Sequence, residues 1–218
     1  MKNNLQKKDG LSMSEKVKSK FSYGLVLQSI GNALSKIGFE FTPYYWVQEG
    51  ITFSKIPEIK GIPKNFSVDF LSADDIKIIV NNTTGYAEGE FQSRLEKGDK
   101  CIGIKLENEI AAFMWMNFME CYSKPLGYKL LEPDEVYVYG MHTMDSFRGR
   151  NVATFLRYKS YELLRNMGRD KIYSVTERFN TPAVKYKEKL NARNLKLVLY
   201  IGLFNKLHWR IPLRSYRA

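Results

Sequence analysis

The spacing of apolar and polar residues divides the chain into a helical start, an aromatic extended stretch and a long alternation of strands and helices. Between Ser14 and Ile37, apolar residues recur three and four positions apart with lysines between them, which predicts an amphipathic helix. Residues 39 to 51 are rich in aromatic side chains and predict an extended arm. Two prolines and a glycine between residues 57 and 63 then indicate a linker.

After the linker, β-branched and aromatic runs of strand length alternate with segments of helical period. The predicted strands cover residues 66–71, 101–107, 110–122, 135–144, 171–177, 195–203 and 207–211. The predicted helices cover residues 72–80, 86–97 and 153–167, and a further helix begins near residues 180–182. Residues 123 to 134 predict a long connection of the kind that often borders a binding site.

The stretch from residue 135 to residue 167 joins a strand to a long helix through a short turn that contains glycine and arginine. The first backbone N–H groups of such a helix have no partner within the helix, and the helix dipole makes this end favourable for an anion. Arg148 and Arg150 add positive charge beside these amides. The junction therefore predicts a phosphate-binding site.

The turn reads Arg148-x-x-Asn151-x-Ala153 and resembles the pyrophosphate-binding motif Arg/Gln-x-x-Gly-x-Gly/Ala of the GNAT N-acetyltransferase superfamily. Asn151 stands at a glycine position of that motif, and asparagine tolerates unusual backbone angles better than most residues. The resemblance implies that acetyl-CoA, or another acyl-CoA, binds as co-substrate along the strand and the turn. The residues implied in binding it are Met141, Thr143, Arg148, Gly149, Arg150, Asn151, Val152, Ala153 and Asn180.

A second segment resembles the GNAT pattern Asn-x-x-Ala-x-x-Leu-Tyr-x-Lys-x-Gly-Phe, and Asn180, Ala183 and Lys189 match it in register. In many family members the tyrosine of this pattern protonates the departing coenzyme A sulfur. Here Lys187 occupies the tyrosine position, and Tyr186 stands one residue earlier. The resemblance therefore implies Tyr186 or Lys187 as the acid, with release of the thiolate into water as the alternative.

The order of predicted elements from about residue 66 to residue 211 is that of the GNAT fold. The resemblance implies an α/β (α+β) GNAT fold, with a mixed central sheet of about six to seven strands flanked by helices. The predicted division of the chain has an N-terminal extension over residues 1–62 and an acyltransferase domain over residues 63–218. The extension comprises an unstructured start over residues 1–14, the amphipathic helix and the aromatic arm.

Acyl transfer to an amine requires a neutral nitrogen, so a group must accept a proton from the alkyl ammonium. The glutamate that many family members carry on the fourth strand is absent, because its position falls near Tyr139 or Gly140. His142 on that strand and Glu177 at the end of the next strand are the candidate bases, and proton loss through ordered water is the alternative. The implied reaction moves an acetyl or other acyl group to a primary amine of an unidentified small acceptor in a ternary complex.

The net charge of +11 indicates an anionic partner. Besides a CoA thioester, an acidic acyl carrier protein fits this charge, as does an anionic membrane surface on which the N-terminal helix lies instead of packing on the domain. Nucleic acid is disfavoured, because the sequence has no zinc-ligand spacing, helix-turn-helix or aromatic RNA-binding signature. A non-catalytic CoA-binding module is the alternative to an enzyme.

Cys101 and Cys121 form no disulfide framework, and no Cys/His cluster has metal-ligand spacing, so the sequence predicts no metal site. No apolar run reaches the length of a membrane span, and no apolar segment follows the first charges. These features predict a cytoplasmic protein, with peripheral membrane contact as the alternative. The C-terminal strand can pair within the sheet or across a dimer, so both a monomer and a homodimer fit.

Overall fold

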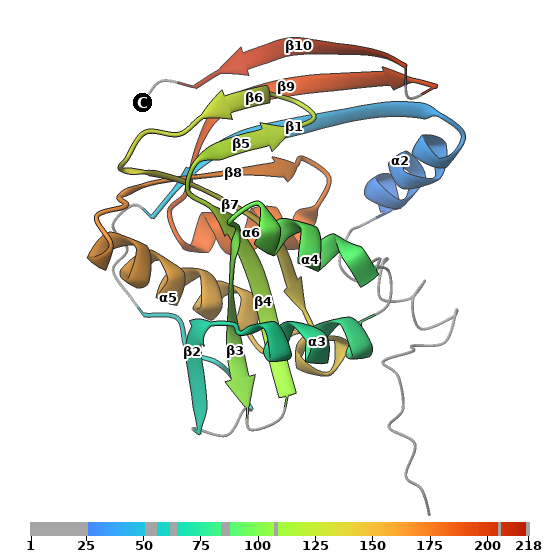
Figure 1. The fold of residues 1–218 in the computed structure, drawn as a ribbon. Helices are drawn as coiled ribbons and strands as arrows, with labels where there is room; N and C mark the ends of the chain where they lie inside the picture. Colours follow the sequence, from blue (N-terminus) through green and yellow to red (C-terminus); the bar gives the residue numbers. More distant parts are fainter. Residues whose placement is uncertain are drawn as a thin grey trace, which may run out of the picture.

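The computed structural model describes residues 26–50, 56–61, 65–83, 88–106, 109–204 and 206–216, arranged as Figure 1 shows. The predicted unstructured start lies outside the described residues, as does the first part of the predicted N-terminal helix. The described part of that helix is α2 (Val26–Lys36), on which the apolar side chains of Ile30 and Leu34 are exposed. No helix in the described part of the chain has the length and apolar content needed to cross a membrane.

In the described part of the chain, eight strands form one mixed sheet in the order β10-β9-β1-β8-β7-β4-β3-β2. Its strands are β1 (Phe39–Glu49), β2 (Phe66–Phe70), β3 (Lys100–Leu106), β4 (Glu109–Asn117), β7 (Glu135–Thr143), β8 (Lys171–Glu177), β9 (Arg193–Leu203) and β10 (Leu207–Ser215). Neighbouring strands run antiparallel, except that β7 and β8 run parallel. The predicted mixed sheet flanked by helices is confirmed, with eight strands in place of about six to seven.

Helices cover both faces of the sheet, and alternate residues of β4 supply the two cores. Met114 packs in the core beneath α5, whereas Phe113 packs in the core beneath α3 and α4. We call these two sides the α5 face and the α3 face. The helices are α3 (Ala73–Asn82), α4 (Glu88–Glu96), α5 (Val152–Asn166) and α6 (Thr181–Lys189).

The aromatic segment that the sequence places in an N-terminal arm is an internal strand of the sheet. Strand β1 pairs with β8 over Tyr44–Glu49 and with β9 over Phe39–Gln48. Its last residue, Glu49, is 1% exposed. This corrects the predicted division of the chain, because residues 39 to 49 belong to the sheet of the domain rather than to an extension outside it.

The predicted strand over residues 110–122 is interrupted by a turn, and the predicted loop over residues 123–134 contains a strand. The turn forms because the side-chain oxygen of Asn117 accepts hydrogen bonds from the amides of Met119 and Glu120 at 2.9 and 2.7 Å. β5 (Glu120–Ser123) and β6 (Gly127–Leu130) then form a separate hairpin, and Lys124 in its turn pairs with Glu40 of β1 at 2.6 Å. Sequence periodicity alone did not predict this hairpin.

Candidate active site

Strands β7 and β8 begin as a parallel pair and then separate. Their pairing ends at Tyr137 and Tyr173, although β7 continues to Thr143 and β8 continues to Glu177. The facing backbone groups of the later residues are therefore not used between the two strands. A groove of about 1520 Å³ opens at this separation.

A β-bulge changes the course of β7 at the groove. Phe113 of β4 pairs with His142, but Trp115 pairs with Tyr139, so β7 contains one more residue than β4 over this interval. Gly140 lies in the bulge with a φ of 60°, and a Cβ there would lie 3.2 Å from the Trp115 ring. Only glycine adopts this positive φ without strain and leaves room for the Trp115 ring. The bulge turns the second half of β7 toward the groove that it lines.

The turn before α5 has the backbone geometry of an anion site. Gly149 and Asn151 have φ values of 76° and 65°, so asparagine adopts the left-handed conformation that the family motif assigns to glycine. Asn151 is the N-cap residue of α5, but its side chain donates to the Glu58 carbonyl at 2.9 Å and does not cap the helix. The first residues of α5, Val152–Thr154, line the groove, where such uncapped amides favour a phosphate.

The sequence predicts that Arg148 and Arg150 act together on the anion, but the structure separates them. Arg148 lines the groove, and Asp145 holds its guanidinium in an ion pair of 2.6 Å. Arg150 donates to the Gly61 carbonyl at 2.8 Å, away from the described lining of the groove. Of these two arginines, Arg148 is thus the one that lines the groove, and Arg150 joins the linker over residues 56–61 to the turn.

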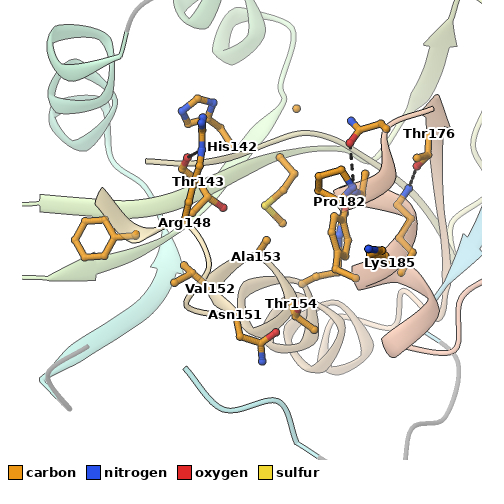
Figure 2. A pocket seen from close by; sticks show the side chains of 18 of the residues that line it. His142, Thr143, Arg148, Asn151, Val152, Ala153, Thr154, Thr176, Pro182 and Lys185 are labelled. Atoms are coloured by element: carbon orange, nitrogen blue, oxygen red, sulfur yellow. Dashed lines mark hydrogen bonds between the residues drawn. The ribbon is translucent and has the colours of Figure 1, made fainter. Parts of the chain in front are cut away.

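Helix α6 forms the opposite wall of the groove, as Figure 2 shows. It begins where the sequence predicts, because the side-chain oxygen of Asn180 accepts a hydrogen bond from the Ala183 amide at 3.2 Å and Pro182 stands in the first turn. Asn180, Pro182 and Lys185 line this wall. In Figure 2, Pro182 and Lys185 lie across the groove from Thr143.

The family model described as acetyltransferase (GNAT) family matches residues 72 to 192. The chain belongs to the GNAT family. The match contains both walls of the groove, from β7 through the turn and α5 to α6. No curated protein matches the chain.

Solved structures of other GNAT proteins share this fold. An acetyltransferase of the GNAT family from Colwellia psychrerythraea is 13% identical with a TM-score of 0.57, covering 89% of this chain and 75% of that chain. A tandem GNAT protein from the clavulanic acid biosynthesis pathway is 11% identical with a TM-score of 0.53, covering 88% and 60%. A GNAT-family protein from Novosphingobium aromaticivorans is 16% identical with a TM-score of 0.51, covering 76% and 65%. The chain therefore spans less than two thirds of the length of the last two proteins, and the likeness is one of fold.

Two adjacent residues of α6, Tyr186 and Lys187, face different surroundings, as the turn of a helix requires. The Tyr186 oxygen lies beside the groove and accepts a hydrogen bond from the buried Arg157 at 3.1 Å. Lys187 is 5% exposed, donates to hydroxyls of β8 that include Ser174 at 2.7 Å, and pairs with Glu49 at 3.1 Å. Both residues line the groove, but the residue at the family's tyrosine position is engaged with the sheet, whereas the hydroxyl of the displaced tyrosine contacts Arg157.

Glu49 is the centre of a buried ionic network that sequence reasoning missed. Its carboxylate pairs with Arg157 at 3.2 Å and Lys187 at 3.1 Å, and Tyr161 donates a hydrogen bond to it at 2.5 Å. Burial alone raises the pKa of Glu49, but Arg157, Lys187 and the hydrogen bonds from Ser174 and Tyr161 bring this pKa down to about 2. Glu49 therefore stays ionised and ties β1 to α5, α6 and β8.

The two candidate bases, His142 and Glu177, line the groove from the two diverging strands. Thr176 contacts Lys187 on the α5 face, so the alternation along β8 directs Glu177 toward the α3 face. His142 pairs with Phe113, a residue of the α3 face, and the two rings stack at 5.4 Å. Both candidates therefore lie on the face opposite α5.

Proposed function

We propose that this GNAT protein moves an acetyl group, or another acyl group, from acyl-CoA to a primary amine of a small acceptor by direct attack in a ternary complex. The separation of β7 from β8 beside the uncapped start of α5 is the observation that carries this proposal. It leaves backbone donors and acceptors for an extended pantetheine arm next to a site for its pyrophosphate.

The groove offers a separate group for each part of the co-substrate. The first amides of α5 suit the pyrophosphate, because the positive end of the helix favours an anion, and Arg148 adds positive charge to the lining of the same groove. Backbone N–H groups near Met141 and Thr143 suit the pantetheine arm and the thioester oxygen. When bound, acyl-CoA supplies an activated acyl group, and preorganised donors of this kind are worth several kcal/mol.

Proton transfer needs a base for the acceptor and an acid for the thiolate. The base is His142 or Glu177. Both lie on the α3 face, and one of them accepts the proton that the ammonium group of the acceptor must lose. On the acid side, we assign Tyr186, since its oxygen accepts from Arg157 and its own proton remains free to be donated into the groove. Lys187 is a positioning residue in this proposal, because its ammonium is engaged by Glu49 and by β8.

Titration calorimetry with acetyl-CoA and with CoA tests the binding half of the proposal. We expect the wild-type protein to bind both in the micromolar range, and Arg148→Ala to bind at least about tenfold more weakly because a charge-assisted contact is lost. Arg150→Ala should have a smaller effect, because Arg150 holds the linker. Arg193→Ala removes an exposed charge outside the described lining of the groove and serves as the matched control.

Release of free thiol from acetyl-CoA, measured with a panel of primary amines, tests the chemical half. Thiol release that depends on an amine supports the proposal. Failure to bind either nucleotide would refute it. Tight binding without thiol release for any amine would instead favour a CoA-binding module, and release only from an acyl carrier protein would change the donor.

A further inference from the structure

Strands β1, β9 and β10 run side by side in the sheet (Figure 1). Their register aligns apolar residues in rows across the three strands. Paired residues of antiparallel strands point to the same side of a sheet, so cross-strand rows can be read from the register. The three rows are Phe39–Leu203–Leu207, Phe41–Ile201–Trp209 and Pro43–Leu199–Ile211. These nine residues, which we call the apolar face, lie on the α5 face because Phe41 shares its side of β1 with Glu49.

Five of these nine residues are exposed to solvent, three are half-buried and Pro43 is buried. Phe41 is 62% exposed, Leu207 is 56% exposed and Trp209 is 46% exposed. Phe204, which is also exposed, extends the face by packing its ring against Phe39 at 5.0 Å. Half-exposed side chains of this size present roughly 100 Å² each, so the face is at the upper end of the range of about 300–600 Å² for the largest apolar patch of a monomeric protein.

The opposite side of the same three strands is polar. Its first two rows are Glu40–Gly202–His208 and Thr42–Tyr200–Arg210. The β5–β6 hairpin contacts this side, since Arg210 donates to the Lys124 carbonyl at 2.7 Å and Lys124 pairs with Glu40 at 2.6 Å, while the β10 residues themselves stay exposed. A sheet with one side in water usually buries its apolar side and exposes its polar side, whereas here the apolar side is left without a covering element.

The charge around the apolar face identifies the kind of partner. From residue 206 onward the sequence contains basic residues, including Lys206 and Arg214, and no aspartate or glutamate. Strand β10 is the edge of the sheet, and pairing it with β10 of a second copy would bring these like charges together. An anionic surface, in contrast, attracts them.

We propose that the apolar face docks this protein onto an anionic membrane surface. Apolar side chains enter the interface, Trp209 lies at the level of the head groups, and Lys206 and Arg214 meet lipid phosphates. Helix α2 leads directly into β1 and adds a second stripe of exposed apolar residues at helical spacing. That stripe consists of Ile30 and Leu34 on the helix and Ile37 in the turn that follows it.

Co-sedimentation of the full-length protein with vesicles of phosphatidylcholine, with and without phosphatidylglycerol, tests this proposal. We expect binding to the anionic vesicles, weakening as salt is added. Phe41→Gln/Trp209→Gln should bind at least about tenfold more weakly. Tyr122→Gln/Tyr128→Gln is the matched control and should bind as the wild type does, because these aromatic residues are 68% and 59% exposed but lie on the hairpin.

Circular dichroism spectra of the variants must match that of the wild type. A loss of vesicle binding is then due to the altered apolar face and not to misfolding. Tryptophan emission provides a second measurement, since Trp115 is fully buried, Trp46 is half-buried and Trp209 is exposed. The emission of wild-type protein should shift to the blue when anionic vesicles are added. Three results would overturn the proposal: equal binding by wild type and the Phe41→Gln/Trp209→Gln variant, no binding to anionic vesicles, or a dimer that this variant dissociates.

Discussion

Replacing Glu49 with glutamine leaves Arg157 and Lys187 buried without a carboxylate. Folding lowers the pKa of Glu49 from 4.5 to about 2, and at about 1.36 kcal/mol per pKa unit this corresponds to about 3 kcal/mol of stability at neutral pH. Breaking a buried ion pair by removing one partner typically costs about 3–5 kcal/mol. We therefore expect Glu49→Gln to lower the free energy of unfolding by about 3–5 kcal/mol near neutral pH.

The same effect has a defined pH dependence. Because the pKa of Glu49 is lower in the folded state, its stabilisation is complete above pH 4.5 and is lost as the pH falls toward about 2. The difference in unfolding free energy between wild type and Glu49→Gln should therefore shrink by about 1.4 kcal/mol per pH unit below that point. Urea denaturation followed by circular dichroism, from neutral pH down to the start of acid unfolding, measures this difference.

Two further variants test whether the loss of stability comes from the buried ionic network or from replacing any glutamate. Glu109→Gln changes an exposed glutamate at the start of β4 and should alter stability by less than about 0.5 kcal/mol. Glu49→Gln/Lys187→Met should be more stable than Glu49→Gln alone, because one unpaired buried cation is also removed. A Glu49→Gln protein as stable as the wild type, or a difference that does not change with pH, would refute the reasoning.

Three more predictions concern the groove. Tyr186→Phe should lower kcat by about a hundredfold while acetyl-CoA binding measured by calorimetry stays unchanged, and an unchanged kcat would remove Tyr186 from the acid role. Of His142→Gln and Glu177→Gln, one should lower kcat by about 10²–10⁴ in the thiol-release assay, whereas full activity in both would leave proton loss to water. Gly140→Ala should destabilise the protein by about 1 kcal/mol or more in urea denaturation, since alanine is strained at a φ of 60° and its Cβ would meet the Trp115 ring; wild-type stability would mean that the bulge relaxes.

Much of the secondary structure was predictable because its signals are local. The start of α3 is one example, since Ser72 and Asp75 form a capping box that can be read from residue types and spacing. The phosphate turn is another, because the left-handed conformation of Asn151 agrees with its place in the family motif. Both features depend on residues within a few positions of one another.

The position of β1 could not be read in the same way. An aromatic run predicts a strand, but the choice of neighbours depends on residues more than a hundred positions away, such as Ser174 and Arg157. A sequence signal did exist, because Arg157 follows Phe155 and Leu156 on the buried side of α5 and a buried arginine requires an anion. The pattern alone does not say that the anion is Glu49.

The assignment of Tyr186 and Lys187 shows the same limit within the site. Sequence register places them about 100° apart on the helix but does not say which one contacts the buried carboxylate of Glu49. The contact between Lys187 and Glu49 sets the rotation of α6, and Tyr186 is then turned toward Arg157. A substitution in β1 is thereby connected to the proposed acid on α6.

This connection gives Glu49 a second role that stability alone does not require. Arg157 contacts both the carboxylate of Glu49 and the oxygen of Tyr186, so loss of the carboxylate changes the position of the guanidinium that orients the proposed acid. Under conditions where Glu49→Gln is still fully folded, kcat should therefore fall while the KM for acetyl-CoA changes little. If the Glu49 carboxylate only stabilises the fold, the kcat of the folded variant equals that of the wild type. Comparing the two kcat values therefore separates the structural role of Glu49 from its role in orienting Tyr186.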